Sequence, residues 1–149
     1  MGGLHHMTHV QVIDDSSSLR QLVRAMLEPE GYTVAEAENG AEGLERLRAA
    51  EQPMVVLLDY QMPVLDGAGV LTAVSTDGGT LLGHEYIVIS ANTSTFPESF
   101  IELLRSLSIR ILPKPFDHAA LVTVVSQAKE RLDAPRFETA PWETAGEDE

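Results

Sequence analysis

Residues 54–67 read MVVLLDYQMPVLDG and decide how the rest of the chain is organised. The run opens with five apolar residues and no polar alternation, which is typical of a strand buried on both faces of a parallel sheet. Pro53 and Pro63 leave too little room for a buried helix, the competing interpretation. The run ends on Asp59, and ligands of open α/β sheets bind beyond the carboxyl ends of the strands. A lone aspartate there more often caps or turns the chain, so Asp59 has to be judged with the residues that join it.

Composition and charge exclude several classes of partner. The chain has 149 residues, no cysteine and a formal net charge of −13. This length suits one domain with its own core, and the lack of cysteine excludes disulfides and thiolate zinc sites. A strongly acidic protein is repelled by a phosphate backbone, so no direct nucleic-acid partner is expected. No apolar run reaches the length of a membrane span and no signal peptide is evident, so we expect a cytoplasmic protein without a membrane partner.

Short apolar runs alternate with amphipathic stretches along the whole chain. The expected strands are 10–13, 32–35, 54–58, 86–89 and 109–112. The expected helices begin near Ser16, Asn39, Asp66, Pro97 and Asp117. A strand–helix unit repeated five times predicts an α/β fold, with a doubly wound parallel sheet and helices on both faces. Two of these helices carry apolar faces made of Leu19, Leu22, Val23, Met26 and Leu27 in the first case, and Phe100, Ile101, Leu103, Leu104 and Leu107 in the second.

Both ends of the chain differ in composition from the part between them. Residues 1–8 read as a disordered leader, and residues 9–132 as the folded domain. Residues 133–149 are acidic and contain proline, and such a segment buries too little apolar surface to offset its ordering entropy. We therefore expect a disordered acidic tail, in which Trp142 is incidental rather than a docking anchor.

Four of the expected strands end on polar residues that could share one site. These residues are the pair Asp14-Asp15, then Asp59, Ser90 and Lys114. Parallel strands bring their carboxyl ends to one edge, and three carboxylates packed there repel one another. One lysine cannot balance three carboxylates, which implies a divalent metal. A site of oxygen ligands favours Mg²⁺, or a hard relative such as Mn²⁺.

This set of groups suits phosphoryl transfer. The Asp59 carboxylate can attack a phosphorus atom in line, while the metal and Lys114 neutralise the phosphoryl oxygens and Ser90 donates a hydrogen bond. A haloacid-dehalogenase-type phosphatase also uses a strand-end aspartate. Such an enzyme needs a second aspartate two residues later as general acid, and Gln61 stands at that place.

The chain resembles the receiver domain of bacterial two-component response regulators over about residues 8–132, in the manner of the stand-alone chemotaxis receivers. The residues that carry the resemblance are VIDDS at 12–16, LDYQMP at 58–63 with Asp66-Gly67, ISA at 89–91 and KPF at 114–116. The resemblance implies a flavodoxin-like sheet in the order 2-1-3-4-5. It also implies a phosphoacceptor module rather than an enzyme, with at most self-phosphorylation and slow autodephosphorylation. The phosphoryl group would come from a sensor histidine kinase or a histidine phosphotransfer protein.

The resemblance also assigns roles to single residues. Asp59 would be the phosphoacceptor and, with Asp15, a direct metal ligand, while the Gln61 carbonyl adds a third ligand and Asp14 acts through water. The backbone of Ala91 would contact the phosphoryl group, and the bond before Pro115 is often cis. Output would pass to a downstream protein target, and a homodimer could form through helix 97–107, strand 109–112 and the helix that starts at Asp117.

Two departures from the family pattern affect the switch rather than the phosphate chemistry. Receivers usually carry Tyr or Phe three residues before the lysine, where this chain has Ile111, and Ser106-Leu107-Ser108 replaces the usual Gly-Ala pair. We expect Ile111 to be buried with and without phosphate, so the response should centre on residues 91–107. A receiver-like interaction domain that phosphate does not switch is therefore kept as an alternative. Either a separate protein reads the state, or the chain is a piece of a larger regulator.

Overall fold

The computed structural model describes residues 8–77 and 79–134, which form a five-stranded parallel sheet between two layers of helices. The strand order is β2-β1-β3-β4-β5, as the resemblance implied. The strands are β1 (His9–Ile13), β2 (Thr33–Ala37), β3 (Val55–Asp59), β4 (Glu85–Ser90) and β5 (Arg110–Pro113). All four neighbouring pairs of strands are parallel, so every carboxyl end lies at the same edge.

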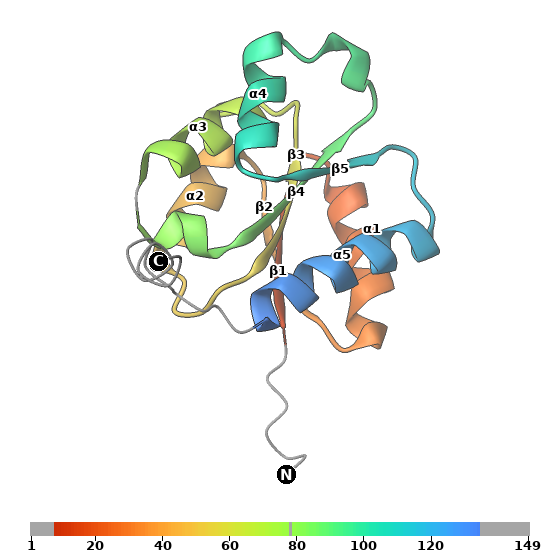
Figure 1. The fold of residues 1–149 in the computed structure, drawn as a ribbon. Helices are drawn as coiled ribbons and strands as arrows, with labels where there is room; N and C mark the ends of the chain where they lie inside the picture. The colour runs from red at the N-terminus through yellow and green to blue at the C-terminus, as the bar shows by residue number, and fades with distance from the viewer. Residues whose placement is uncertain (1–7, 78, 135–149) are drawn as a thin grey trace, which may run out of the picture.

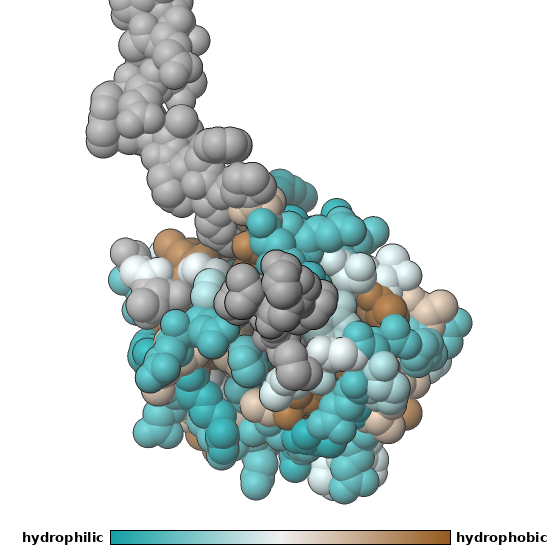
Figure 2. All heavy atoms as spheres, turned by 90° about the horizontal axis from the view of Figure 1, so that it is seen from below, coloured by the Kyte–Doolittle hydropathy of each residue, from teal (hydrophilic) through white to brown (hydrophobic). Residues whose placement is uncertain are grey.

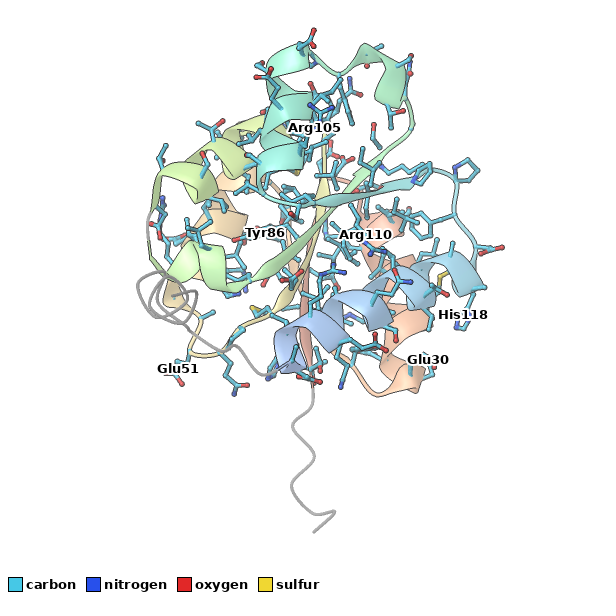
Figure 3. The ribbon with its side chains drawn as sticks, in the orientation of Figure 1. Glu30, Glu51, Tyr86, Arg105, Arg110 and His118 are labelled. Carbon is cyan, nitrogen blue, oxygen red and sulfur yellow. The ribbon has the colours of Figure 1, made fainter. Side chains whose placement is uncertain are left out.

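Helices connect the strands and cover both faces of the sheet. They are α1 (Ser17–Leu27), α2 (Gly40–Ala49), α3 (Gly67–Asp77), α4 (Glu98–Ser106) and α5 (His118–Asp133), with short 3₁₀ turns at Glu28–Glu30, Thr80–Gly83 and Thr93–Thr95. Figure 1 shows α1 and α5 on one side of the sheet, and α2, α3 and α4 on the other. In Figure 3, His118 at the start of α5 lies beside Glu30, and the imidazole Nε2 is 3.5 Å from the Glu30 carboxylate.

Four of the five predicted helix starts are confirmed by capping hydrogen bonds, whereas α4 begins after Pro97 without a side-chain cap. The side chains of Ser16, Asn39 and Asp117 accept from the backbone N–H groups of the residues three positions later. The Asp66 carboxylate accepts from the Gly69 N–H at 2.9 Å, just as α3 begins. These bonds satisfy N–H groups that have no partner inside the helix.

β3 joins the two halves of the hydrophobic core. All five of its residues are buried, and successive side chains of a strand point to opposite faces. Val55 and Leu57 belong to the cluster under α1 and α5, whereas Val56 and Leu58 belong to the cluster under α2, α3 and α4. The lack of polar alternation in the apolar run at residues 54–58 is thus explained, because helices cover both faces of this strand.

Three large apolar side chains of the predicted strands and helices are exposed, and one of them, Ile111, was expected to be buried. Leu22 is 43% exposed, Ile101 38% and Ile111 36%. On the two helices the buried face is narrower than the apolar face, so a residue at its margin remains in solvent. β5 is an edge strand, hydrogen-bonded to β4 alone, and Ile111 therefore has neighbours on fewer sides than a residue of β3. The expectation that Ile111 is buried is wrong.

Among the described residues no helix is long and apolar enough to cross a membrane. Seen from below in Figure 2, the described surface is mostly hydrophilic, and its hydrophobic patches are small and separate. The predicted leader and tail lie outside the described residues, apart from Thr8 at one end and Asp133 and Ala134 at the other.

Candidate functional site

The carboxyl edge of the sheet brings together the residues predicted from the strand ends. Asp14 follows β1, Asp59 ends β3, Ser90 ends β4 and Lys114 follows β5. The edge is continued by backbone hydrogen bonds: the Asp14 N–H donates to Ala37 O at 3.1 Å, and the Lys114 N–H donates to Ser90 O at 2.8 Å. Parallel pairing of the strands therefore brings together strand-end residues that are as far apart in the sequence as Asp14 and Lys114.

Three carboxylates and one ammonium group meet there. Asp14, Asp15 and Asp59 each offer an oxygen, and these atoms lie within 4.8 Å of one another. Lys114 Nζ lies 3.2 Å from Asp59 Oδ1 and 3.5 Å from Asp14 Oδ2. Asp14 is 1% exposed and Asp59 6%, whereas Asp15 is exposed. The site thus has a buried pair of carboxylates and an open side at Asp15.

Burial and mutual repulsion make this site costly to ionise. Burial, together with the neighbouring Asp14 carboxylate and against the opposing effect of Lys114, raises the pKa of Asp59 to about 6. Burial also raises the pKa of Asp14, against the Ser16 N–H and Lys114, which both favour its charged form. The one lysine does not offset desolvation and repulsion together.

The residues present fit a hard divalent cation. Asp14 Oδ2 is buried and accepts no hydrogen bond from the described part of the chain, although a buried carboxylate oxygen normally has a partner. The other donors of the cluster are carboxylate oxygens as well. A set of oxygen ligands carrying excess negative charge is what Mg²⁺, Mn²⁺ and Ca²⁺ require.

The remaining predicted site residues surround this cluster. Ser90 is 5% exposed, and its hydroxyl accepts from the Asn92 N–H at 3.2 Å. Gln61 and Ala91 are exposed in the loops that follow β3 and β4. Ile111 pairs with Val88, two residues before Ser90 along β4, and so lies behind the edge. The bond between Lys114 and Pro115 is cis, as the resemblance implied.

Close backbone packing supports the loop after β3. The Gly67 N–H donates to Tyr60 O at 2.9 Å. A Cβ atom at Gly67 would lie 2.8 Å from Asp59 O and 2.9 Å from Tyr60 Cα, both of them backbone atoms. Only glycine lets the start of α3 approach the end of β3 this closely.

Two features of the site were not predicted from the sequence. The Tyr60 ring packs against Phe96 and Phe100, with centroids 4.6 and 4.7 Å apart, and so joins the residue after Asp59 to α4. Arg20 Nη1 donates to Asp14 O at 2.7 Å. A partner in space leaves no mark in the local sequence, so neither contact had a signal that could have revealed it.

The fold and the acidic edge define a phosphoacceptor-type signalling domain, and comparison with known proteins agrees. The family model for the response regulator receiver domain matches residues 10–126. The chain belongs to this family, in which a phosphoacceptor role is typical. Receiver domains are typically signal transducers rather than enzymes.

Individual relatives show how much of each protein is shared. A protein-glutamate methylesterase/protein-glutamine glutaminase of Moorella thermoacetica is 35% identical over 84% of the chain, and the transcriptional regulator NtrC of Escherichia coli K12 is 34% identical over 80%. The matched regions span only 29% and 24% of those proteins. The structure of the chemotaxis protein CheY4 of Vibrio cholerae superposes with a TM-score of 0.70 at 26% identity, over 83% of this chain and 99% of that one.

Proposed function

We propose that the chain accepts a phosphoryl group on Asp59 in a Mg²⁺-dependent reaction and so acts as a response regulator receiver. One observation carries this assignment. The Asp59 carboxylate ends the central strand with the Lys114 ammonium at 3.2 Å, inside a cluster of three carboxylates that fits a hard cation. A carboxylate nucleophile, a fixed cation and a metal site are the parts that phosphoryl transfer needs.

In the proposed reaction an Asp59 oxygen forms a bond to phosphorus. The bond from phosphorus to the donor's imidazole nitrogen breaks, and its electron pair stays on that nitrogen. Lys114 Nζ turns from the carboxylate to a phosphoryl oxygen, and the Ser90 hydroxyl and the Ala91 backbone N–H donate to the others. Mg²⁺, held by Asp14, Asp15, Asp59 and the Gln61 carbonyl, would supply charge neutralisation.

The reaction needs the ionised form of Asp59. Burial raises the pKa of Asp59 to about 6, so most molecules carry the charged carboxylate at pH 7.5. Lys114 also keeps the nucleophilic group oriented before a donor arrives. Acyl phosphate formation is therefore supported near neutral pH.

The proposed partners follow from this role. The donor is a sensor histidine kinase or a histidine phosphotransfer protein in the cytoplasm, and the state is read by a downstream protein. The half-exposed Ile101 of α4 and Ile111 of β5 support a homodimer through α4, β5 and α5. Since Ile111 carries no aromatic ring, we infer that the response centres on residues 91–107, and that the contact of Tyr60 with Phe96 and Phe100 helps to carry it.

Intact-mass spectrometry tests the proposal directly. After incubation with acetyl phosphate and Mg²⁺, the wild type should gain one phosphoryl group, and Asp59→Asn should gain none. Full labelling of Asp59→Asn, or no labelling of the wild type, would refute the assignment. Labelling without any change in the amide spectrum of residues 91–107 on adding beryllofluoride would instead favour the interaction domain that phosphate does not switch.

A further inference from the structure

Arg20 reaches from the first turn of α1 to the backbone of the acidic loop. Its Nη1 donates to Asp14 O at 2.7 Å, and its Nε donates to Glu36 Oε1 on β2 at 2.9 Å. The side chain is 12% exposed. A guanidinium that is this well buried and hydrogen-bonded through two of its nitrogens holds its two partners at a defined separation.

The carbonyl that Arg20 binds belongs to the peptide between Asp14 and Asp15. Two further polar atoms of Asp14 are engaged, because its N–H donates to Ala37 O and its Oδ1 accepts from the Ser16 N–H at 2.8 Å. The orientation of Asp14 is therefore determined by hydrogen bonds around the residue.

Asp15 depends on that peptide more than Asp14 does. Its carboxylate is exposed, and within the described residues no hydrogen bond or ion pair holds it. The peptide before Asp15 sets the position of its backbone and therefore contributes to where this carboxylate lies. Among the side chains that the structure describes, only the guanidinium of Arg20 hydrogen-bonds to that peptide, through the Asp14 carbonyl.

The guanidinium is suited to this task. Its nitrogens lie in a rigid planar fork, so one nitrogen can bind a carboxylate while another binds a carbonyl, whereas a lysine has a single nitrogen. Glu36 is itself held by Arg24, whose Nε donates to Glu36 Oε2 at 2.9 Å. Arg24 lies one turn later on α1 and also pairs with Glu28, and its polar contacts do not include Asp14.

We propose that Arg20 is a positioning residue for the metal-binding carboxylates. Because it is bound to Glu36 on β2, it holds the Asp14-Asp15 peptide in a fixed position relative to that strand. The inference rests on the proposed function, because the carboxylates matter only if they bind the metal. Arg20 is not itself one of the groups that would bind the metal or the phosphoryl group. Residues that orient metal ligands typically change metal affinity 10- to 100-fold when they are replaced.

Arg20→Lys and Arg24→Lys form a matched pair for the test. Both keep the charge and weaken the bond to Glu36, but only Arg20→Lys also loses the bond to Asp14 O. Titration of each full-length variant with MgCl₂ in a calorimeter should show affinity about 10-fold lower for Arg20→Lys, and within about twofold of wild type for Arg24→Lys. The melting temperatures of the two variants should fall by similar amounts.

A second readout needs no metal. The amide nitrogen of Asp15 reports on the hydrogen bond to the preceding carbonyl, so its chemical shift should move in metal-free Arg20→Lys and stay in Arg24→Lys. Arg20→Gln, which can make one of the two bonds, should behave as Arg20→Lys does and serves if the lysine variant does not fold.

The possible results separate this inference from the proposed function. Wild-type Mg²⁺ affinity in Arg20→Lys, or an equal loss in both variants, would overturn the positioning role. A wild type that binds Mg²⁺ but never takes up a phosphoryl group would overturn the proposed function and leave the role of Arg20 standing.

Discussion

Asp59→Asn should make the metal-free protein more stable at neutral pH, although it removes the proposed phosphoacceptor. The exchange keeps the size of the side chain and an oxygen for Lys114, and it removes a buried charge beside Asp14. Burial raises the pKa of Asp59 from 3.8 to about 6. At about 1.4 kcal/mol per pH unit, this difference makes the ionised carboxylate unfavourable by about 3 kcal/mol in the folded state.

The size of this effect changes with pH in a defined window. Because the pKa of Asp59 is higher in the folded than in the unfolded protein, the destabilisation is complete above pH 6 and absent below about pH 4. The advantage of Asp59→Asn should therefore be about 3 kcal/mol at pH 7.5 and should vanish as the pH falls to 4. Saturating Mg²⁺ should stabilise the wild type and narrow the difference.

Urea denaturation in EDTA, followed by circular dichroism at pH 7.5 and pH 4, measures these differences. Glu51→Gln is the control, because Glu51 is exposed and lies far from α4 and the carboxyl edge in Figure 3. Its free energy of unfolding should match that of the wild type at both values. The reasoning fails if Asp59→Asn is no more stable than wild type at pH 7.5, or if its advantage persists unchanged at pH 4.

Three further variants probe other parts of the molecule. Lys114→Ala should still take up phosphate from acetyl phosphate, but with a much smaller change in the amide spectrum; loss of the folded circular dichroism signal would instead mean a structural role. Gly67→Ala should lower the free energy of unfolding by about 1–3 kcal/mol, because the new Cβ meets backbone atoms, whereas Gly83→Ala, with open space around it, should cost little. Burial lowers the pKa of His84, so its contribution to stability is present above its ordinary pKa and lost as the pH falls through the lowered value. His84→Gln should therefore lose less stability than wild type between pH 7 and pH 5, and equal losses would contradict this.

Much of the fold could be predicted because a parallel α/β topology produces recognisable local sequence patterns. Short apolar runs and capping residues mark each unit, and the sheet then brings the strand ends together without further information. Boundaries were less certain where a strand carries charge. The second strand was expected to end at Ala35, yet it continues through Glu36, whose carboxylate is neutralised by Arg20 and Arg24.

The rest of the site depends on neighbours that the local sequence does not specify. Ile111 has the composition of a core residue, and its exposure follows from the place of β5 at the edge of the sheet. Arg20 resembles any charged residue on a surface helix until its carbonyl partner is known. Electrostatic reasoning from the strand ends could predict that a cation is needed, but not which side chain orients the carboxylates.

The two-sided burial of β3 has a consequence for how the molecule can open. Since its side chains belong to both clusters, separation of either layer of helices would expose apolar side chains of β3. Amide protons of β3 should then exchange with solvent only through global unfolding. β5 has one hydrogen-bonded neighbour and shows three of its four side chains to solvent, so its protons should exchange through local opening. The domain thus has a rigid centre that holds the aspartate and a compliant edge where a partner can bind at little energetic cost.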